Sequence, residues 1–203
     1  MPAVTALIAL HYQNDVLHEN GKIRVGLGAD SPARQNLISA ASMLLQRARA
    51  CKMPIVHVRI AFRPDYADLV PNMPVMRNVV AIEAMTEGSW GAQFYPDLAP
   101  DETNPLEFVV KHTRINAFFG SPLEEVLRAV HASRLLIAGV ATHSVVEGTL
   151  RHAADAGYDV MVAAPACASA NPATHQASLD SMSLMAEILD ADGVSHFFDN
   201  YPS

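Results

Sequence analysis

Short apolar runs, separated by longer amphipathic or polar segments, recur along most of the chain. The runs over residues 3–10 (AVTALIAL) and 54–60 (PIVHVRI) predict two buried strands in the first third of the chain. Later runs predict four more strands, over residues 106–111, 134–140, 158–164 and 194–198. The runs are continuously apolar and do not alternate with polar positions, which is typical of strands in a parallel sheet covered on both faces.

The first segment between these runs carries a clear helix signal. Ser31 and Pro32 predict a helix in which Ser31 is the N-cap and proline occupies the first helical position. This helix is expected to continue to about Ala50. Its apolar side chains recur at helical spacing, at Leu37, Ala41, Leu44, Leu45 and Ala48.

Helix signals also separate the later runs. Ser121, Pro122 and Glu124 have the pattern of a capping box and predict a helix to about His131. Two further helices are expected, over residues 144–156 with Gly157 as the C-cap, and over residues 172–189. Alternating strands and helices predict an α/β fold of three layers, in which a six-stranded parallel sheet has helices on both faces.

Composition narrows the class of protein. The 203 residues are 50% hydrophobic and 17% charged, which favours one globular domain over residues 1–203. Residues 61–106 are richer in Pro, Asn and Asp, and we expect a long excursion with one short helix there. The net charge of -7, with scattered basic residues, argues against a nucleic-acid partner. No apolar run is long enough to span a membrane, and only two cysteines are present, so we expect a cytoplasmic protein.

Polar side chains follow three of the predicted strands at their carboxyl ends. His11 follows the first strand, Lys111 ends the third, and the turn GVATHSVVEGT over residues 139–149 follows the fourth. In an open parallel sheet, ligands bind beyond these ends of the strands. If the three strands are neighbours, His11, Lys111 and the helix start near Ser144 converge on one pocket.

Several segments, in order along nearly the whole chain, resemble one known family. They are ALIALHYQND, PIVHVRIAFRPDY, EGSWGAQFYPDLAP, VVKHTRINAFFGSPLEEVL and LLIAGVATHSVVEGTLRHAADAGYDVMVAAPACAS. The pattern is similar to that of the isochorismatase-like hydrolases, also called cysteine hydrolases. The resemblance implies a Rossmann-like sheet of six parallel strands between helices and a small-molecule substrate. It also implies a homo-oligomer, a dimer or larger.

The resemblance also assigns roles to individual positions. The family's catalytic Asp, Lys and Cys would fall at His11, Lys111 and Val145, so that only the lysine is retained. A non-proline cis peptide bond would join Val140 and Ala141 and shape an oxyanion hole made of backbone N–H groups. Residues implied at or near the substrate are Gln13, Trp90, Phe118, Phe119, Val140, Ala141, His143 and Ser144.

Valine at position 145 excludes covalent catalysis by a thiol at that position. His11 could instead act as a general base on water, because an imidazole titrates near neutral pH. Asp15 is a weaker candidate for the missing carboxylate. Ser144 is expected to be a helix cap rather than a nucleophile. We expect His112 to point away from its neighbour Lys111 and to have no role.

Neither a metal nor another cofactor is predicted. His57 lies inside a predicted strand, and Asp65 has no histidine at a spacing that would suit a metal site. Three functional hypotheses remain open. The chain is a hydrolase that acts without a thiol, an inactive relative that binds a small molecule or serves in assembly, or a cysteine hydrolase that uses Cys167 or Cys51 instead.

Overall fold

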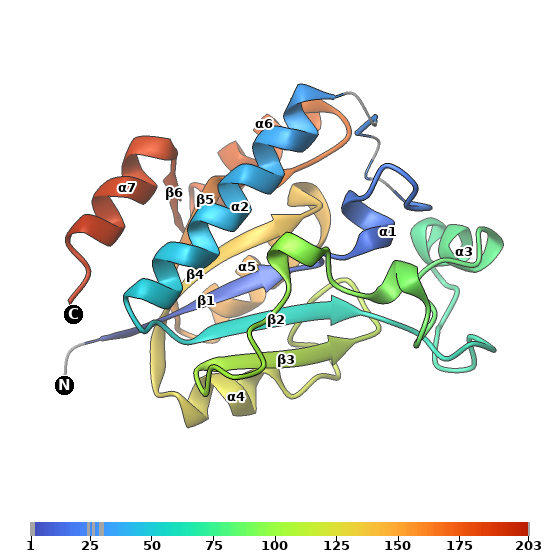
Figure 1. Ribbon diagram of the computed structural model, residues 1–203, viewed down its shortest axis with the longest axis horizontal. Coiled ribbons are helices and arrows are strands. Elements are labelled where there is room, and N and C mark those ends of the chain that lie inside the picture. The colour runs from blue at the N-terminus through green and yellow to red at the C-terminus, as the bar shows by residue number, and fades with distance from the viewer. Residues whose placement is uncertain (1–2, 24, 26, 29–30, 203) are drawn as a thin grey trace.

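Six parallel strands form the sheet of the computed structural model, in the order β3-β2-β1-β4-β5-β6. The structure describes residues 3–23, 25, 27–28 and 31–202. The fold class predicted from the sequence is confirmed, because helices cover both faces of this sheet (Figure 1). The strands are β1 (Val4–Leu10), β2 (Ile55–Ile60), β3 (Glu107–His112), β4 (Ala132–Val140), β5 (Asp159–Ala168) and β6 (Glu187–Leu189).

Seven α-helices are found among the described residues, together with short 3-10 and π turns. Helices α2 and α7 cover one face of the sheet, and α4 and α5 cover the other (Figure 1). No helix in the described ranges is long and apolar enough to cross a membrane. The helices are α1 (Asn14–Leu17), α2 (Pro32–Ala50), α3 (Pro74–Ala81), α4 (Leu123–Ala129), α5 (Glu147–Asp155), α6 (Pro172–Met182) and α7 (Ala191–Asp199). The shorter turns are η2 (Trp90–Ala92), η3 (Pro96–Leu98) and η4 (Thr142–Val146).

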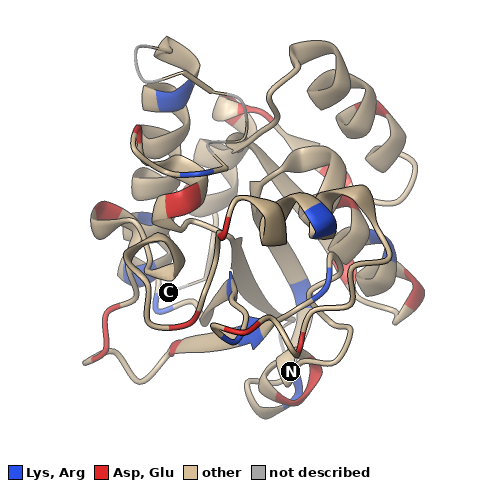
Figure 2. Cartoon of the chain, turned by 90° about the vertical axis from the view of Figure 1, so that its right-hand side faces the viewer, with Lys and Arg blue, Asp and Glu red and all other residues tan. Residues whose placement is uncertain are grey.

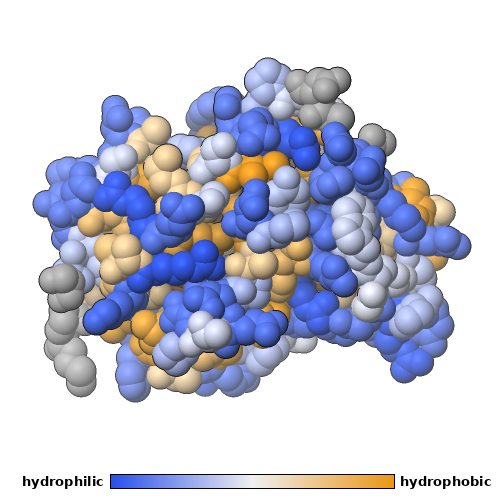
Figure 3. Space-filling model, in the orientation of Figure 1, coloured by the Kyte–Doolittle hydropathy of each residue, from blue (hydrophilic) through white to orange (hydrophobic). Residues whose placement is uncertain are grey.

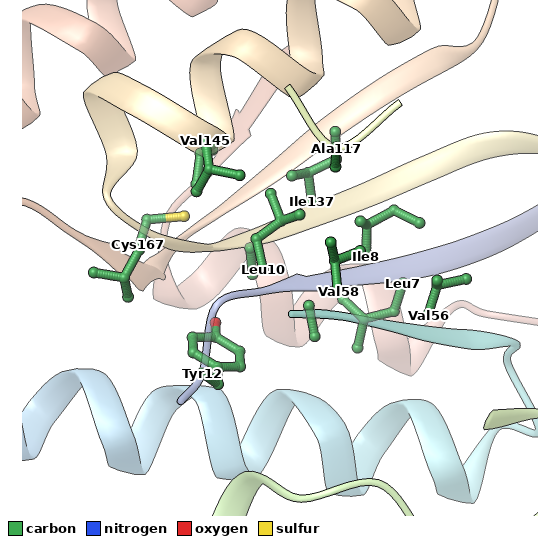
Figure 4. Packing of buried hydrophobic residues seen from close by; sticks show 14 of the residues in the cluster. Leu7, Ile8, Leu10, Tyr12, Val56, Val58, Ala117, Ile137, Val145 and Cys167 are labelled. Atoms are coloured by element: carbon green, nitrogen blue, oxygen red, sulfur yellow. The ribbon is translucent and has the colours of Figure 1, made fainter. Parts of the chain in front are cut away.

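The apolar runs become strands because both of their faces are covered. Leu7, Ile8 and Leu10 of β1 have no exposed surface and pack against Val56 and Val58 of β2 and their neighbours in the core (Figure 4). Burying one such aliphatic side chain stabilises the fold by roughly 1.5–3 kcal/mol. On the outside, hydrophobic surface occurs only in small patches among hydrophilic ones on the face that Figure 3 shows. The apolar face predicted for α2 is also confirmed, since all five of its residues are buried.

Strands β1 and β4 come unusually close together near their carboxyl ends. Leu10 pairs with Gly139 in the parallel ladder. A Cβ atom at position 139 would overlap both the backbone and the side chain of Leu10, and the φ angle of Gly139 is 150°. Only glycine therefore allows this approach, which brings the ends of the two strands to the same place.

The carboxyl-terminal segment differs from the sequence prediction. The helix expected over residues 172–189 ends at Met182, and the sixth strand is Glu187–Leu189. The strand expected over residues 194–198 lies instead within α7, whose first turn is capped by the Asp190 side chain accepting from the Gly193 amide at 2.8 Å. The apolar positions 194, 197 and 198 fit helical spacing, and Asp190 provides the helix start that the apolar run alone concealed.

Two other predicted helix starts are also corrected. Ser121 accepts a hydrogen bond from the Leu123 amide at 3.2 Å, but Glu124 pairs with Arg128 one turn later and does not complete a capping box. The helix expected from residue 144 begins earlier, as the π turn η4, and continues as α5 from Glu147. In residues 61–106, α3 is joined by the two 3-10 turns η2 and η3.

Replacing Gly139 with alanine should destabilise the protein by about 2 kcal/mol or more, because the new Cβ forces β1 and β4 apart. The free energy of unfolding, measured in urea, checks this expectation. Gly28→Ala is the control, since a Cβ at position 28 meets nothing within 4 Å. Equal stabilities of the two variants would show that the close approach at Leu10 is not a constraint.

Candidate functional site

A cavity of about 700 Å³ lies at the carboxyl ends of the strands. These ends point to the right in Figure 1 and face the viewer in Figure 2, where acidic and basic positions are interspersed. His11 after β1 and Val140 and Ala141 at the end of β4 form part of the wall. The strand order reverses between β1 and β4, so the cavity lies at the position where open α/β sheets bind ligands.

His11 is held in an uncommon backbone conformation at this wall. Its φ angle is 58°, in the left-handed region that few non-glycine residues adopt. The His11 amide donates to the Val58 carbonyl at 2.9 Å, and its own carbonyl accepts from the Gln13 amide at 2.8 Å. These bonds on both sides of the residue hold the backbone in the turn that follows β1. Such conformations concentrate at functional sites.

The His11 ring contacts the ring of His112 at the end of β3. The two Nε2 atoms are 2.5 Å apart and the ring centroids are 4.8 Å apart. Nδ1 of His112 lies 3.4 Å from the Asn116 carbonyl, and His11 is hydrogen-bonded to the backbone of Val140. If both outer nitrogens donate to backbone carbonyls, the two Nε2 lone pairs face each other. A single proton then fits between them.

Burial lowers the pKa of both histidines. The pKa of His11 is well below its ordinary value, first because the ring is buried and second because His112 repels a charge on it. Burial also lowers the pKa of His112 to about 4. The pair is therefore neutral near pH 7, with a lone pair available to accept a proton. Repulsion between the rings means that the pair accepts one proton more readily than two.

Lys111 does not lie at this site, contrary to the sequence expectation. Its ammonium group is partly exposed and pairs with Glu87 at 3.2 Å and with Asp68 at 4.0 Å. Successive residues of a strand point to opposite faces, so His112 faces His11 and Lys111 faces outward. The expectation that the two neighbours diverge is correct, but His112 is the one at the site.

Val145 also lies away from the cavity, in the hydrophobic core. It is 1% exposed and belongs to the same core cluster as Leu10 and Cys167 (Figure 4). The Cys167 thiol is buried, donates to the Ala163 carbonyl at 3.4 Å, and does not line this cavity. Burial raises its pKa to about 12, which opposes formation of a thiolate. Cys51 is the C-cap of α2, four residues before β2 begins, and does not line the cavity at the carboxyl ends of the strands.

A sequence profile of the isochorismatase domain matches residues 5–193, nearly the whole chain. The chain belongs to the isochorismatase family. Two relatives carry the name ureidoacrylate amidohydrolase RutB. The protein from Stutzerimonas stutzeri is 29% identical over 83% of this chain and 71% of its own length, and that from Pseudomonas syringae pv. syringae is 28% identical over 84% and 73%.

Solved structures show the same family fold. A cysteine hydrolase from Pseudomonas syringae pv. phaseolicola superposes with a TM-score of 0.83 at 20% identity, over 98% of this chain and 93% of its own. The nicotinamidase PncA of Bacillus subtilis superposes with a TM-score of 0.76 at 24% identity, over 91% and 98%. The family assignment made from the sequence motifs is confirmed by the match of the isochorismatase domain over residues 5–193.

The turn after β4 has the geometry that the family resemblance implied. The bond between Val140 and Ala141 is a cis peptide, and the π turn η4 starts at the next residue. Ala141, His143 and Ser144 of this turn line the cavity wall. The Ser144 amide donates to the Ala141 carbonyl at 3.1 Å within the turn. His143 Nδ1 is also 2.8 Å from the Ser169 hydroxyl.

Four other residues expected near the substrate do not line the cavity. Gln13 is fully buried; its side-chain amide donates to the Ile60 and Ala92 carbonyls, while its oxygen accepts from the Ile60 amide. Trp90 packs edge-on against His18, and Phe118 stacks on His152. Phe119 is 65% exposed. The homo-oligomer implied by the resemblance, in which such aromatics would be covered, stays a prediction.

Asp15 is not the missing carboxylate. It is buried at 3% exposure and accepts hydrogen bonds from the amides of Met85 and Lys22. A Cβ on Gly91 would overlap its carboxylate, which shows how tightly the group is enclosed. No cluster of three or more potential metal ligands is present in the part of the chain that the structure describes. His57, at the opposite end of the sheet, pairs with Glu107 at 2.9 Å.

Several cavity residues could not be recognised from the sequence. Arg114 lies two residues after His112, Glu147 and Arg151 come from α5, and part of the aliphatic wall comes from α3, within residues 61–106. Helical spacing of apolar residues over 74–81 indicates a buried helix face, but not that this face lines a cavity. Strand periodicity could have predicted that His112 and Lys111 point to opposite faces of the sheet. It could not have predicted which of the two side chains faces the site.

Stability should fall as the pH decreases from about 6.5 toward 4, because both histidines have a lower pKa in the folded protein than the ~6.5 of an unfolded chain. Their contribution is present above pH 6.5 and is lost during acidification, with a slope of roughly 1–3 kcal/mol per pH unit. Urea unfolding from pH 7.5 to 4 measures it. The doubly substituted His11→Asn/His112→Asn protein should show a shallower decline than the exposed-site control His131→Asn. Parallel pH curves for the two variants would contradict the expectation.

The Cys167 thiol should be nearly inert in the folded protein. A pKa of about 12 lowers the thiolate fraction at pH 8 by roughly a thousandfold relative to an ordinary thiol. Labelling with iodoacetamide, followed by peptide mass spectrometry, measures the reaction at Cys167 with and without denaturant. Rapid labelling of the native protein at this position would revive the hypothesis of a cysteine hydrolase that uses Cys167.

Proposed function

We propose that this protein is a hydrolase that activates water, not a side-chain nucleophile, to cleave a small molecule in the cavity. The observation that carries the proposal is the neutral His11–His112 pair, whose His11 ring lines the cavity wall next to the turn after β4. The pair occupies the place for which the sequence suggested His11 and Lys111. It supplies a base near neutral pH where neither an Asp nor a thiol is at hand.

In the proposed reaction, each group of cavity residues has a separate role. Water attacks the electrophilic carbon of the substrate, and the proton that it loses passes to the His11–His112 pair, where the two Nε2 atoms share it. Amides of the turn around Ala141 and His143 hold the negative oxygen that forms. When this intermediate collapses, the bond to the leaving group breaks and the pair returns its proton to that group. His112 does not line the cavity and acts through His11, as a positioning residue.

The bond type to test first is an amide-type C–N bond. Two relatives with about 28–29% identity carry the name amidohydrolase, and the same turn geometry suits a tetrahedral oxyanion. The proposed substrate is thus a small carboxamide or ureido compound. We further propose that the protein acts in the cytoplasm, since its two cysteines are unpaired.

A second candidate function is binding without turnover. It is favoured by the position of Val145, which is packed in the core, so that no thiol lies on the wall among the described residues. A protein of this kind would be stabilised by a ligand of the cavity through mass action, and it would release no product on long incubation. Product analysis by mass spectrometry separates the two candidates.

His11→Asn should lower kcat at least 100-fold on the best substrate from a panel of carboxamides, ureido compounds and esters, because a general base contributes 10²–10⁴-fold. His112→Asn should also lower kcat and shift the pH–rate profile, whereas Lys111→Ala should stay within about twofold of wild type because its side chain faces outward. Circular dichroism verifies that each variant is folded. Full activity of both histidine variants, or loss of activity in Lys111→Ala, would refute the assignment of roles.

A further inference from the structure

Arg114 places an uncompensated positive charge on the cavity wall. Its guanidinium donates to the Val70 carbonyl at 3.2 Å and to the Asn72 side-chain oxygen at 3.1 Å. Both acceptors are neutral, and no ion pair between Arg114 and a carboxylate is found among the described residues. The two bonds orient the guanidinium from one side and leave its charge unpaired.

The other charged side chains of the wall, among the residues that the structure describes, are Glu147 and Arg151, and they pair with each other. Glu147 accepts from Arg151 at 2.7 Å with one oxygen and from the Ser178 hydroxyl at 2.7 Å with the other. The histidine pair is neutral near pH 7, since burial lowers the pKa of both rings. Among the described residues of the wall, Arg114 therefore contributes the net charge, and that charge is positive although the whole protein carries -7.

The rest of the wall is largely aliphatic. One helix, α3, contributes Val75, Met76 and Val79, and Ile60 and Met85 extend the same surface. A cavity of about 700 Å³ is within the range of typical small-molecule sites, which enclose an apolar body and fix it by a few polar groups. An uncharged polar ligand would leave both the aliphatic surface and the charge of Arg114 without a partner.

We infer that the ligand of this cavity is a small monocarboxylate with an apolar body, whose carboxylate binds Arg114. A guanidinium and a carboxylate match as two parallel hydrogen bonds, and one such pair balances one charge. A phosphate ester would bring a second negative charge, and the other cation among the described residues of the wall, Arg151, is already paired with Glu147. The inference rests on the proposed function only in taking this ligand to be the substrate.

Matched pairs of probes test it by isothermal titration calorimetry at pH 7.5. Hexanoate is compared with hexanamide, and cyclohexanecarboxylate with cyclohexanecarboxamide. For at least one pair the wild type should bind the acid tenfold or more tightly than the amide, and added salt should weaken only the acid. Arg114→Gln should abolish this preference and Arg114→Lys should retain part of it. Arg63→Gln is the control, because Arg63 pairs with Asp65 on the surface and does not line the cavity.

Equal affinities of acid and amide for the wild type in both pairs would overturn the inference, and so would a preference that survives in Arg114→Gln. The salt dependence of the wild type provides a test that no unfolded variant can obscure. Failure of the proposed function looks different. If acids bind through Arg114 but no panel compound is hydrolysed, only the proposed hydrolase function is refuted. If uncharged compounds are hydrolysed and acids are not preferred, only the inference of a carboxylate ligand is refuted.

Discussion

The close approach of β1 to β4 at Leu10 and Gly139 is the contact on which the site depends. Because a glycine lets the two backbones meet there, both strands end at one place and their next residues turn into the same space. His11 leaves β1 in a left-handed conformation, and the cis bond between Val140 and Ala141 leads from β4 into η4. The reversal of strand order at this point keeps the space open above the sheet edge. The cavity, the base and the turn amides thus follow from one packing contact.

Burial gives the histidine pair its chemical character. A lone imidazole in water would be partly charged near neutral pH, but enclosure at the sheet edge keeps His11 and His112 neutral. Their Nε2 atoms face each other because the outer side of each ring is held by backbone groups, at Val140 and at Asn116. A pair held in this way can take one proton from water and return it. Val145, at the position where the family resemblance implied a cysteine, has instead joined the core.

The aliphatic wall and the charge of Arg114 complement this base. The segment between β2 and β3 contributes Val75, Met76 and Val79 of α3 to the wall, whereas His11 and Val140 come from the ends of the central strands. The aliphatic surface of α3 and the residues at the strand ends thus come from different parts of the chain. Changes in residues 61–106 could therefore alter what is bound and leave the histidine pair in place.

The sequence by itself determined the α/β fold class, the buried face of α2 and the family. These features follow from continuous apolar runs and from the order of the motifs, which can be seen along the chain. It also located the turn around Ala141 and excluded a thiol at position 145. It failed where one pattern fits two structures: the apolar residues near 194–198 suit a strand or a helix, and the Asp190 cap selects the helix. Only the tertiary structure decided that His112 and not Lys111 meets His11. Strand periodicity puts neighbours on opposite faces, but which face borders the cavity depends on how the sheet packs against the rest of the chain.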